Sequence, residues 1–173
     1  AVCQIAKILG CRVVGSAGSD EKVAWLLDEV GVDEAFNYKK AANLETTLAA
    51  ACPDGIDVYF ENVGGEHLQA AMNLMNQFGR IVVCGMIAHY NDTSPSPGPN
   101  NMTNIIKSSL RIEGFIVGDH WEKYSEFLDK MTSWIAEGKI KWHETVFEGI
   151  ESAPAAMIAL LNGDNFGKML VRL

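Results

Sequence analysis

The chain has 173 residues, of which 48% are hydrophobic and 21% are charged, and its formal net charge is −8. This composition is typical of one folded core and excludes a disordered segment. The negative charge argues against nucleic acid as a partner, because phosphate backbones are bound by basic surfaces. No run of about 20 apolar residues and no signal peptide is found, so we expect no membrane partner.

The cysteines and histidines show no metal-ligand spacing. No two cysteines form a CxxC pair, and the histidines are scattered, so the sequence predicts no metal site. Scattered cysteines in apolar or helical surroundings are typical of reduced thiols in a cytoplasmic protein. The residues concerned are Cys3, Cys11, Cys52, Cys84, His67, His89, His120 and His143.

The first residues predict a helix. Apolar residues recur at helical spacing over 2–9, and Gly10 is a natural end for the helix. Nothing ahead of Val2 could cap its first turn. We therefore expect the chain to begin after the first βα unit of a larger fold, and a frayed natural terminus is the alternative.

Short strands then alternate with helices. Strands are predicted over 12–15, 34–38, 56–61, 80–84 and 111–117. Helices are predicted over 20–30, 44–51, 66–75, 102–110 and 121–137. This alternation is typical of an α/β fold: a Rossmann-type, doubly wound parallel sheet with helices on both faces, here truncated before its first βα unit.

The remaining segments are a loop and a different C-terminal part. Residues 91–101 are rich in Ser, Pro and Asn and predict either a mobile segment near a substrate or a plain connector. An extended stretch, a helix and a strand are predicted over 141–147, 150–161 and 168–173. These last elements either close the same sheet or belong to another domain.

The end of the second Rossmann strand carries the first cofactor signal. In NAD enzymes an acid there holds the ribose 2′-hydroxyl, but here Gly15–Gly18 follows the strand. Asp20 and Glu21 come later, in the first turn of a helix. Lys22 would favour a 2′-phosphate through a charge-assisted hydrogen bond, and Tyr38 could add a hydroxyl. A solvated lysine and an ordinary strand-end aromatic are the alternatives.

Three later strand ends carry the second signal. Asn62 follows a strand and precedes Gly64 and Gly65, which would let the backbone approach a ligand closely. Gly85 follows the next strand, and 115–117 ends a third. Because parallel strands end at one edge of a sheet, these groups could line one nicotinamide groove. A glycine-rich turn without a ligand is the alternative.

Seven segments together resemble the zinc-independent medium-chain dehydrogenase/reductases, and most closely the leukotriene B4 12-hydroxydehydrogenase group, also called the prostaglandin reductase or curcumin reductase-like group. They span almost the whole chain. The ENVGG, CGxIxxYN and NFGK stretches in this order are far more specific than any one alone. The segments are 10–15, 19–22, 36–38, 57–65, 79–90, 114–117 and 165–168.

The resemblance implies a role for each site residue. Lys22 and Tyr38 would hold the 2′-phosphate of NADPH, and Tyr90 would be the catalytic residue, orienting or protonating the enolate oxygen of the substrate. The remaining cofactor contacts would come from three strand ends and the C-terminal segment. The implied residues are Asn62, Cys84, Gly85, Met86, Ile87, Tyr90, Phe115, Ile116, Val117, Asn165 and Gly167.

The resemblance also implies the reaction and the domain organisation. The expected function is NADPH-dependent reduction of the carbon–carbon double bond of α,β-unsaturated ketones and aldehydes. Residues 1–141 would form the NADP-binding Rossmann domain, N-terminally incomplete. Residues 142–173 would pack on a catalytic domain that precedes the chain. The piece alone would then be inactive, and the full-length protein a homodimer.

Three other functions remain open on the sequence. One is a quinone reductase of the same superfamily. Another is a methyltransferase-like Rossmann domain for S-adenosylmethionine, although that class expects an acid at the end of the second strand. The third is a non-catalytic module that only binds a nucleotide or a partner chain.

Overall fold

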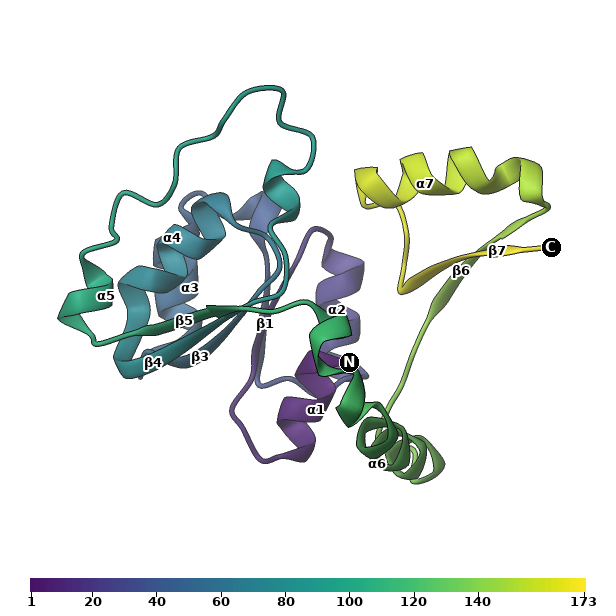
Figure 1. Cartoon of the computed structure of the whole chain (residues 1–173), viewed down its shortest axis with the longest axis horizontal. Coiled ribbons are helices and arrows are strands. Elements are labelled where there is room, and N and C mark those ends of the chain that lie inside the picture. Colours follow the sequence, from purple (N-terminus) through teal and green to yellow (C-terminus); the bar gives the residue numbers. More distant parts are fainter. The chain divides into compact units, whose positions relative to one another are not determined.

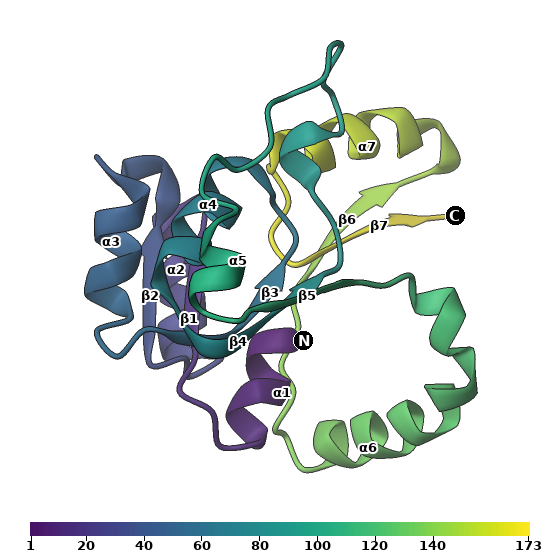
Figure 2. The ribbon, with the colours of Figure 1, turned by 60° about the vertical axis from the view of Figure 1, so that its left-hand side comes forward.

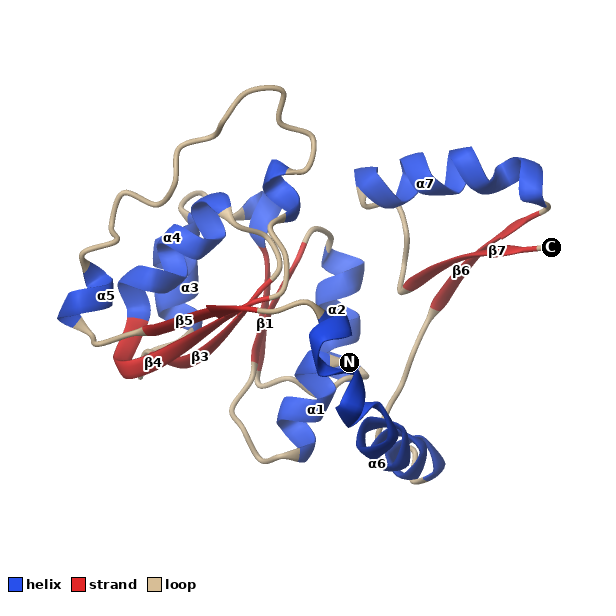
Figure 3. Cartoon of the chain, viewed as in Figure 1, coloured by secondary structure: helices blue, strands red, loops and turns tan.

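The computed structural model describes residues 1–173, which divide into two compact units. The central unit is Lys40–Glu126, and the terminal unit combines Ala1–Lys39 with Phe127–Leu173. Every strand pair is parallel, and helices alternate with strands along the chain (Figure 3). The predicted Rossmann-type α/β class is therefore confirmed.

The central unit is built on a three-stranded parallel sheet in the order β3-β4-β5. Figure 1 shows α4 lying along this sheet, and Figure 2 shows the 91–101 loop arching from the strand ends back to α5. The elements are α3 (Leu44–Ala51), β3 (Ile56–Glu61), α4 (Gly65–Leu74), β4 (Met75–Val83), η2 (Ile87–His89), α5 (Asn104–Lys107), β5 (Arg111–Gly114) and η3 (Val117–Lys123).

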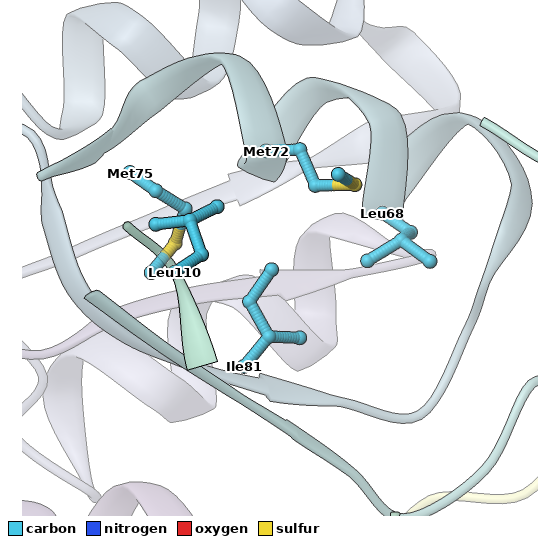
Figure 4. Close-up of a cluster of buried hydrophobic side chains, with 5 residues drawn as sticks. All are labelled: Leu68, Met72, Met75, Ile81 and Leu110. Atoms are coloured by element: carbon cyan, nitrogen blue, oxygen red, sulfur yellow. The ribbon is translucent and has the colours of Figure 1, made fainter. Parts of the chain in front are cut away.

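Apolar side chains of α4 and the sheet form the core of the central unit. Leu68 and Met72, four residues apart on α4, point toward Ile81 of β4 (Figure 4). Met75 and Leu110 complete the cluster, in which Met72 and Ile81 are each only 1% exposed. The i, i+4 spacing places both helical residues on one face, which explains why this face packs on the sheet.

The terminal unit contains two two-stranded parallel sheets, β1-β2 and β6-β7. Helix α2 packs on β1 and β2, and its N-cap Ser19 accepts a hydrogen bond from the Lys22 amide, as the sequence predicts. The elements are α1 (Val2–Ile8), β1 (Val14–Ala17), α2 (Asp20–Asp28), β2 (Glu34–Asn37), η1 (Tyr38–Lys40), α6 (Tyr124–Ala136), β6 (Glu144–Glu148), η4 (Ile150–Ser152), α7 (Ala153–Asn162) and β7 (Lys168–Arg172).

The structure differs from the sequence prediction in several places. β1 (Val14–Ala17) contains most of the Gly15–Gly18 stretch that was expected to follow the strand, and β4 begins at Met75 rather than at residue 80. The helix expected over 102–110 is reduced to Asn104–Lys107, since the serines that follow it favour turns and Ser109 has a positive φ of 47°. β5 ends at Gly114, so Phe115–Val117 lies just beyond the strand. The strands form three hydrogen-bonded sheets, because no strand of the chain pairs with both β1 and β3.

Candidate functional site

The carboxyl ends of β3, β4 and β5 bring three predicted site segments together. Glu61 pairs with Val83, and Val83 pairs with Gly114. The next residues along the three strands are Asn62, Cys84 and Phe115. They therefore emerge next to one another at the edge where open α/β sheets bind their ligands.

Main-chain hydrogen bonds join the turn after β3 to the loop after β4. The carbonyl of Glu61 accepts the amides of Cys84 at 2.9 Å and Gly85 at 3.2 Å. The carbonyl of Asn62 accepts the Ile87 amide at 3.0 Å, and residue 63 accepts the residue 88 amide at 2.9 Å. Main-chain hydrogen bonds thus connect the two predicted cofactor segments into one scaffold.

Two glycines in this scaffold leave room for close packing. A Cβ on Gly85 would lie 2.8 Å from the Tyr90 hydroxyl and 3.7 Å from the Asn62 carbonyl oxygen, so these three predicted residues lie together. Gly64 has a positive φ of 78°, and its α carbon faces the His89 ring. Glycine permits both this backbone conformation and the close approach of the His89 ring.

Apolar side chains cover the end of β5. The Phe115 ring lies 6.3 Å from the Phe60 ring and 6.2 Å from the His120 ring, which keeps it half-buried. Ile116 and Val117 are 71% and 69% exposed. An aromatic edge beside exposed aliphatic groups offers a surface on which a flat ring can pack.

The 91–101 loop borders a cavity of about 650 Å³ beside the start of α4, lined in part by Gly65, Met86 and Pro95. Asp92 accepts the Ser96 hydroxyl at 2.5 Å and pairs with His89 Nδ1 at 3.0 Å. The hydrogen bond from Ser96 and, to a smaller extent, the one with His89 hold the pKa of Asp92 below its usual value. These contacts tie the first half of the loop to η2.

In the terminal unit, Lys22 lies against the end of α7. Its Nζ donates to the carbonyl of Gly163 at 2.6 Å. That bond uses one of the three donors of an ammonium group, so the side chain is oriented while two donors can serve an anion. Gly163 caps α7 in the left-handed conformation, with a φ of 78°.

Tyr38 lies beside two residues that the sequence argument did not select, Gly18 and Lys39. A Cβ on Gly18 would lie 3.0 Å from the Tyr38 hydroxyl and 3.1 Å from Lys39 Cε. The phenol and the lysine therefore converge on the turn between β1 and α2. The consecutive Tyr38, Lys39 and Lys40 were the sequence signal for an additional cation here.

The segment with Asn165 and Gly167 is anchored to α2. Phe166 packs edge-on against Trp25 of α2, with ring centroids 6.0 Å apart, and against His143 at 4.5 Å. Asn165 Nδ2 donates to the Gly167 carbonyl at 2.6 Å. This segment therefore packs against α2, the helix that carries Lys22. The expectation that Lys22 and Tyr38 share one sheet edge with Asn62 stays a prediction.

Two half-buried titratable groups lie close in sequence to the turn after β3. Burial, reinforced by the negative charge of Glu61, raises the pKa of Tyr59 far above its usual value. Burial lowers the pKa of His67 on α4, against an opposing effect of Glu61 and Glu66. Both groups are thus kept neutral near physiological pH.

A family model described as zinc-binding dehydrogenase matches residues 1–133. The structure of CurA from Vibrio vulnificus in complex with NADPH is 45% identical in sequence with a TM-score of 0.92, and the match covers 99% of this chain and 52% of that one. The chain therefore has the fold of the matching part of that protein.

Two sequence relatives cover the chain to a similar extent. Prostaglandin reductase 1 of Rattus norvegicus is 50% identical over 99% of this chain and 52% of its own length. The NADP(+)-dependent 2-alkenal reductase of Nicotiana tabacum is 48% identical over 98% of this chain and 49% of its own length. The chain thus spans about half the length of the relatives that it matches.

Two kinds of feature are absent from the structure. No group of three His, Cys, Asp or Glu side chains lies close enough to hold a metal ion. None of the helices combines the length and the apolar content that a membrane span requires.

Proposed function

Because this chain belongs to the zinc-binding dehydrogenase family, we propose that it is the NADP-binding part of an oxidoreductase that reduces the carbon–carbon double bond of α,β-unsaturated ketones and aldehydes. The sheet edge formed by Asn62, Cys84 and Phe115 is the observation that carries the proposal. The names of the relatives, a prostaglandin reductase and a 2-alkenal reductase, support this substrate class.

Each unit carries groups that suit one part of NADPH. In the terminal unit, the Lys22 ammonium, the Tyr38 hydroxyl and Lys39 would bind the 2′-phosphate. In the central unit, Asn62 and the remaining predicted residues would bind the nicotinamide half; these are Cys84, Gly85, Met86, Ile87, Tyr90, Phe115, Ile116 and Val117. Asn165 and Gly167 would contact the carboxamide region.

Glycines seat two of the proposed site tyrosines. Gly85 presents only hydrogen atoms beside the Tyr90 hydroxyl, and Gly18 does the same beside Tyr38. A Cβ at either position would crowd the tyrosine hydroxyl, so a larger residue would displace the side chain that is proposed to contact the ligand.

In this proposal the bound NADPH supplies a hydride to the β carbon of the substrate. The chain orients the reacting groups and stabilises the charge that develops on the substrate. Reduction of the double bond places negative charge on the carbonyl oxygen. Tyr90, 65% exposed with its hydroxyl against Gly85, is the group that would donate a hydrogen bond or proton to that oxygen. Phe115 would keep the reacting face apolar and exclude water.

A substrate panel tests the proposal. The full-length protein is mixed with NADPH and an enal, an enone, a saturated aldehyde or a quinone, and the loss of NADPH absorbance is followed. Consumption with the enal and the enone, and a product saturated between the α and β carbons, is expected. Preference for the quinone would replace the proposal by a quinone reductase, and tight binding of S-adenosylmethionine would end the oxidoreductase assignment.

Assembly and location belong to the same proposal. A homodimeric, cytoplasmic enzyme is expected on the family resemblance. Sedimentation of the full-length protein at micromolar concentration should give a dimer, and a monomer there would remove that part of the proposal.

A further inference from the structure

Glu61 is a fully buried acid for which the proposed reaction has no use. It ends β3 and is 0% exposed, in a chain whose other acidic residues lie at least partly in solvent. Burying a carboxylate is costly unless hydrogen bonds compensate. Its Oε2 lacks a hydrogen bond of normal geometry, although the Tyr59 side chain lies near the carboxylate, so the position calls for an explanation.

Hydrogen bonds join Glu61 to both proposed cofactor segments, and its carboxylate also faces the Tyr59 side chain. Its Oε1 accepts the amide of Gly64 at 2.9 Å and also that of Val63. Its main-chain carbonyl accepts the amides of Cys84 and Gly85. One residue therefore holds the turn after β3 by its side chain and the loop after β4 by its main chain.

The side-chain bonds fix an unusual backbone. Gly64, the N-cap of α4, has a positive φ of 78° and no side chain that could cap the helix. The Glu61 carboxylate, three residues earlier, takes the amides that would otherwise be unsatisfied there. It thereby fixes the direction in which the chain leaves Asn62, whose carbonyl in turn receives the Ile87 amide.

We propose that Glu61 is a positioning residue, which holds Asn62 and the 84–90 loop in the geometry that binds the nicotinamide half of the cofactor. The inference rests on the proposed function. It separates the two ends of the site: loss of Glu61 would weaken the nicotinamide end and leave the 2′-phosphate end, built on Lys22 and Tyr38, intact.

The test compares two ligands on three variants of the full-length protein. Adenosine 2′,5′-bisphosphate carries the 2′-phosphate but lacks the nicotinamide half, and NADPH carries both. Glu61→Gln keeps the length and an acceptor oxygen, whereas Glu61→Asp keeps the charge but draws the carboxylate back by one methylene, so that the turn must shift to keep both hydrogen bonds. Glu66→Gln, at an exposed acid in the first turn of α4, is the matched control.

We expect Glu61→Asp to weaken NADPH binding by roughly tenfold or more, because a displacement of the binding groups by about 1 Å is enough for such a loss. Glu61→Gln should retain most of the wild-type affinity for NADPH, and neither variant should change the affinity for the bisphosphate. Equal losses for both ligands would show a general structural role and overturn the proposal, as would a larger loss in Glu61→Gln than in Glu61→Asp.

The proposed function fails if the wild-type protein binds neither ligand. A measurement without cofactor tests the role of Glu61 independently of that outcome. Amide hydrogen exchange at residues 63, 64, 84 and 85 should be faster in Glu61→Asp than in wild type or Glu66→Gln. Unchanged exchange at these four amides would show that Glu61 does not hold the two segments together.

Discussion

The central and terminal units hold their predicted cofactor residues by different means. In the central unit, main-chain hydrogen bonds and a buried apolar core fix Asn62 and the 84–90 loop. In the terminal unit, Lys22 and Tyr38 are half-buried or exposed and are held by contacts of single side chains. The central unit therefore offers fixed positions, whereas the terminal unit offers side-chain charge, which we propose discriminates between ligands.

The largest expected effect concerns the core of the central unit. Ile81→Ala removes a side chain that is 1% exposed and should lower the free energy of unfolding by about 2–5 kcal/mol. Ile112→Ala, on the neighbouring strand and 38% exposed, should cost about 1 kcal/mol or less. Urea denaturation measures both. Similar losses in the two variants would mean that the α4–sheet core does not dominate this unit.

The next effect concerns charge in the terminal unit. Lys22→Ala should weaken NADPH binding by roughly 10- to 100-fold and leave NADH binding nearly unchanged, because a charge-assisted hydrogen bond contributes about 1.5–3 kcal/mol. Calorimetric titration gives both constants. Lys139→Ala, which removes an exposed lysine of the same unit, is the control. Equal weakening of NADPH and NADH would show that Lys22 does not recognise the 2′-phosphate.

A smaller effect is expected from the Tyr38 hydroxyl, the second group that is proposed to bind the 2′-phosphate. Tyr38→Phe removes one neutral hydrogen-bond donor and keeps the ring against Gly18. The loss of NADPH affinity should be about 0.5–1.5 kcal/mol, without a change for NADH. The same titration measures it. A loss as large as that of Lys22→Ala would indicate that the ring, rather than the charge, dominates this end.

The smallest effect is a pH dependence in the terminal unit. Hydrogen bonds from Lys7 and from the Val13 amide hold the pKa of Asp33 below its usual value. The unfolded chain then binds more protons than the folded one, so this contribution is complete above the usual aspartate pKa and is lost as the pH falls through the lowered value. Asp33→Asn should reduce stability at neutral pH, and its deficit should shrink on acidification. A deficit independent of pH would contradict this.

Local signals were sufficient to predict most of the fold. The Ser19 cap and the parallel strand pattern lie where periodicity and breakers place them. The strand ends at Asn62, Cys84 and Phe115 follow from the same pattern, because parallel strands end at one edge. The short α5 was missed because serines after an apolar run can continue a helix or end it, and only the turn at Ser109 decides.

Contacts between distant residues could not be predicted. The Lys22–Gly163 hydrogen bond joins positions 141 residues apart, and no local pattern encodes such a pair. The burial of Glu61 is also invisible in the sequence, since a charged residue at a strand end is ordinarily exposed. Lys39 was overlooked because it adjoins Lys40, and the sequence alone does not say which of the two lysines faces the turn at Gly18.

The most direct test of the account is a fluorescence titration of the full-length wild-type protein with NADPH and with NADH, following emission of the reduced nicotinamide ring. If the ring enters the apolar edge beside Phe115 and the terminal unit selects the 2′-phosphate, emission should change in a saturable manner and NADPH should bind more tightly. A linear, unsaturated signal, or tighter binding of NADH, would contradict the account.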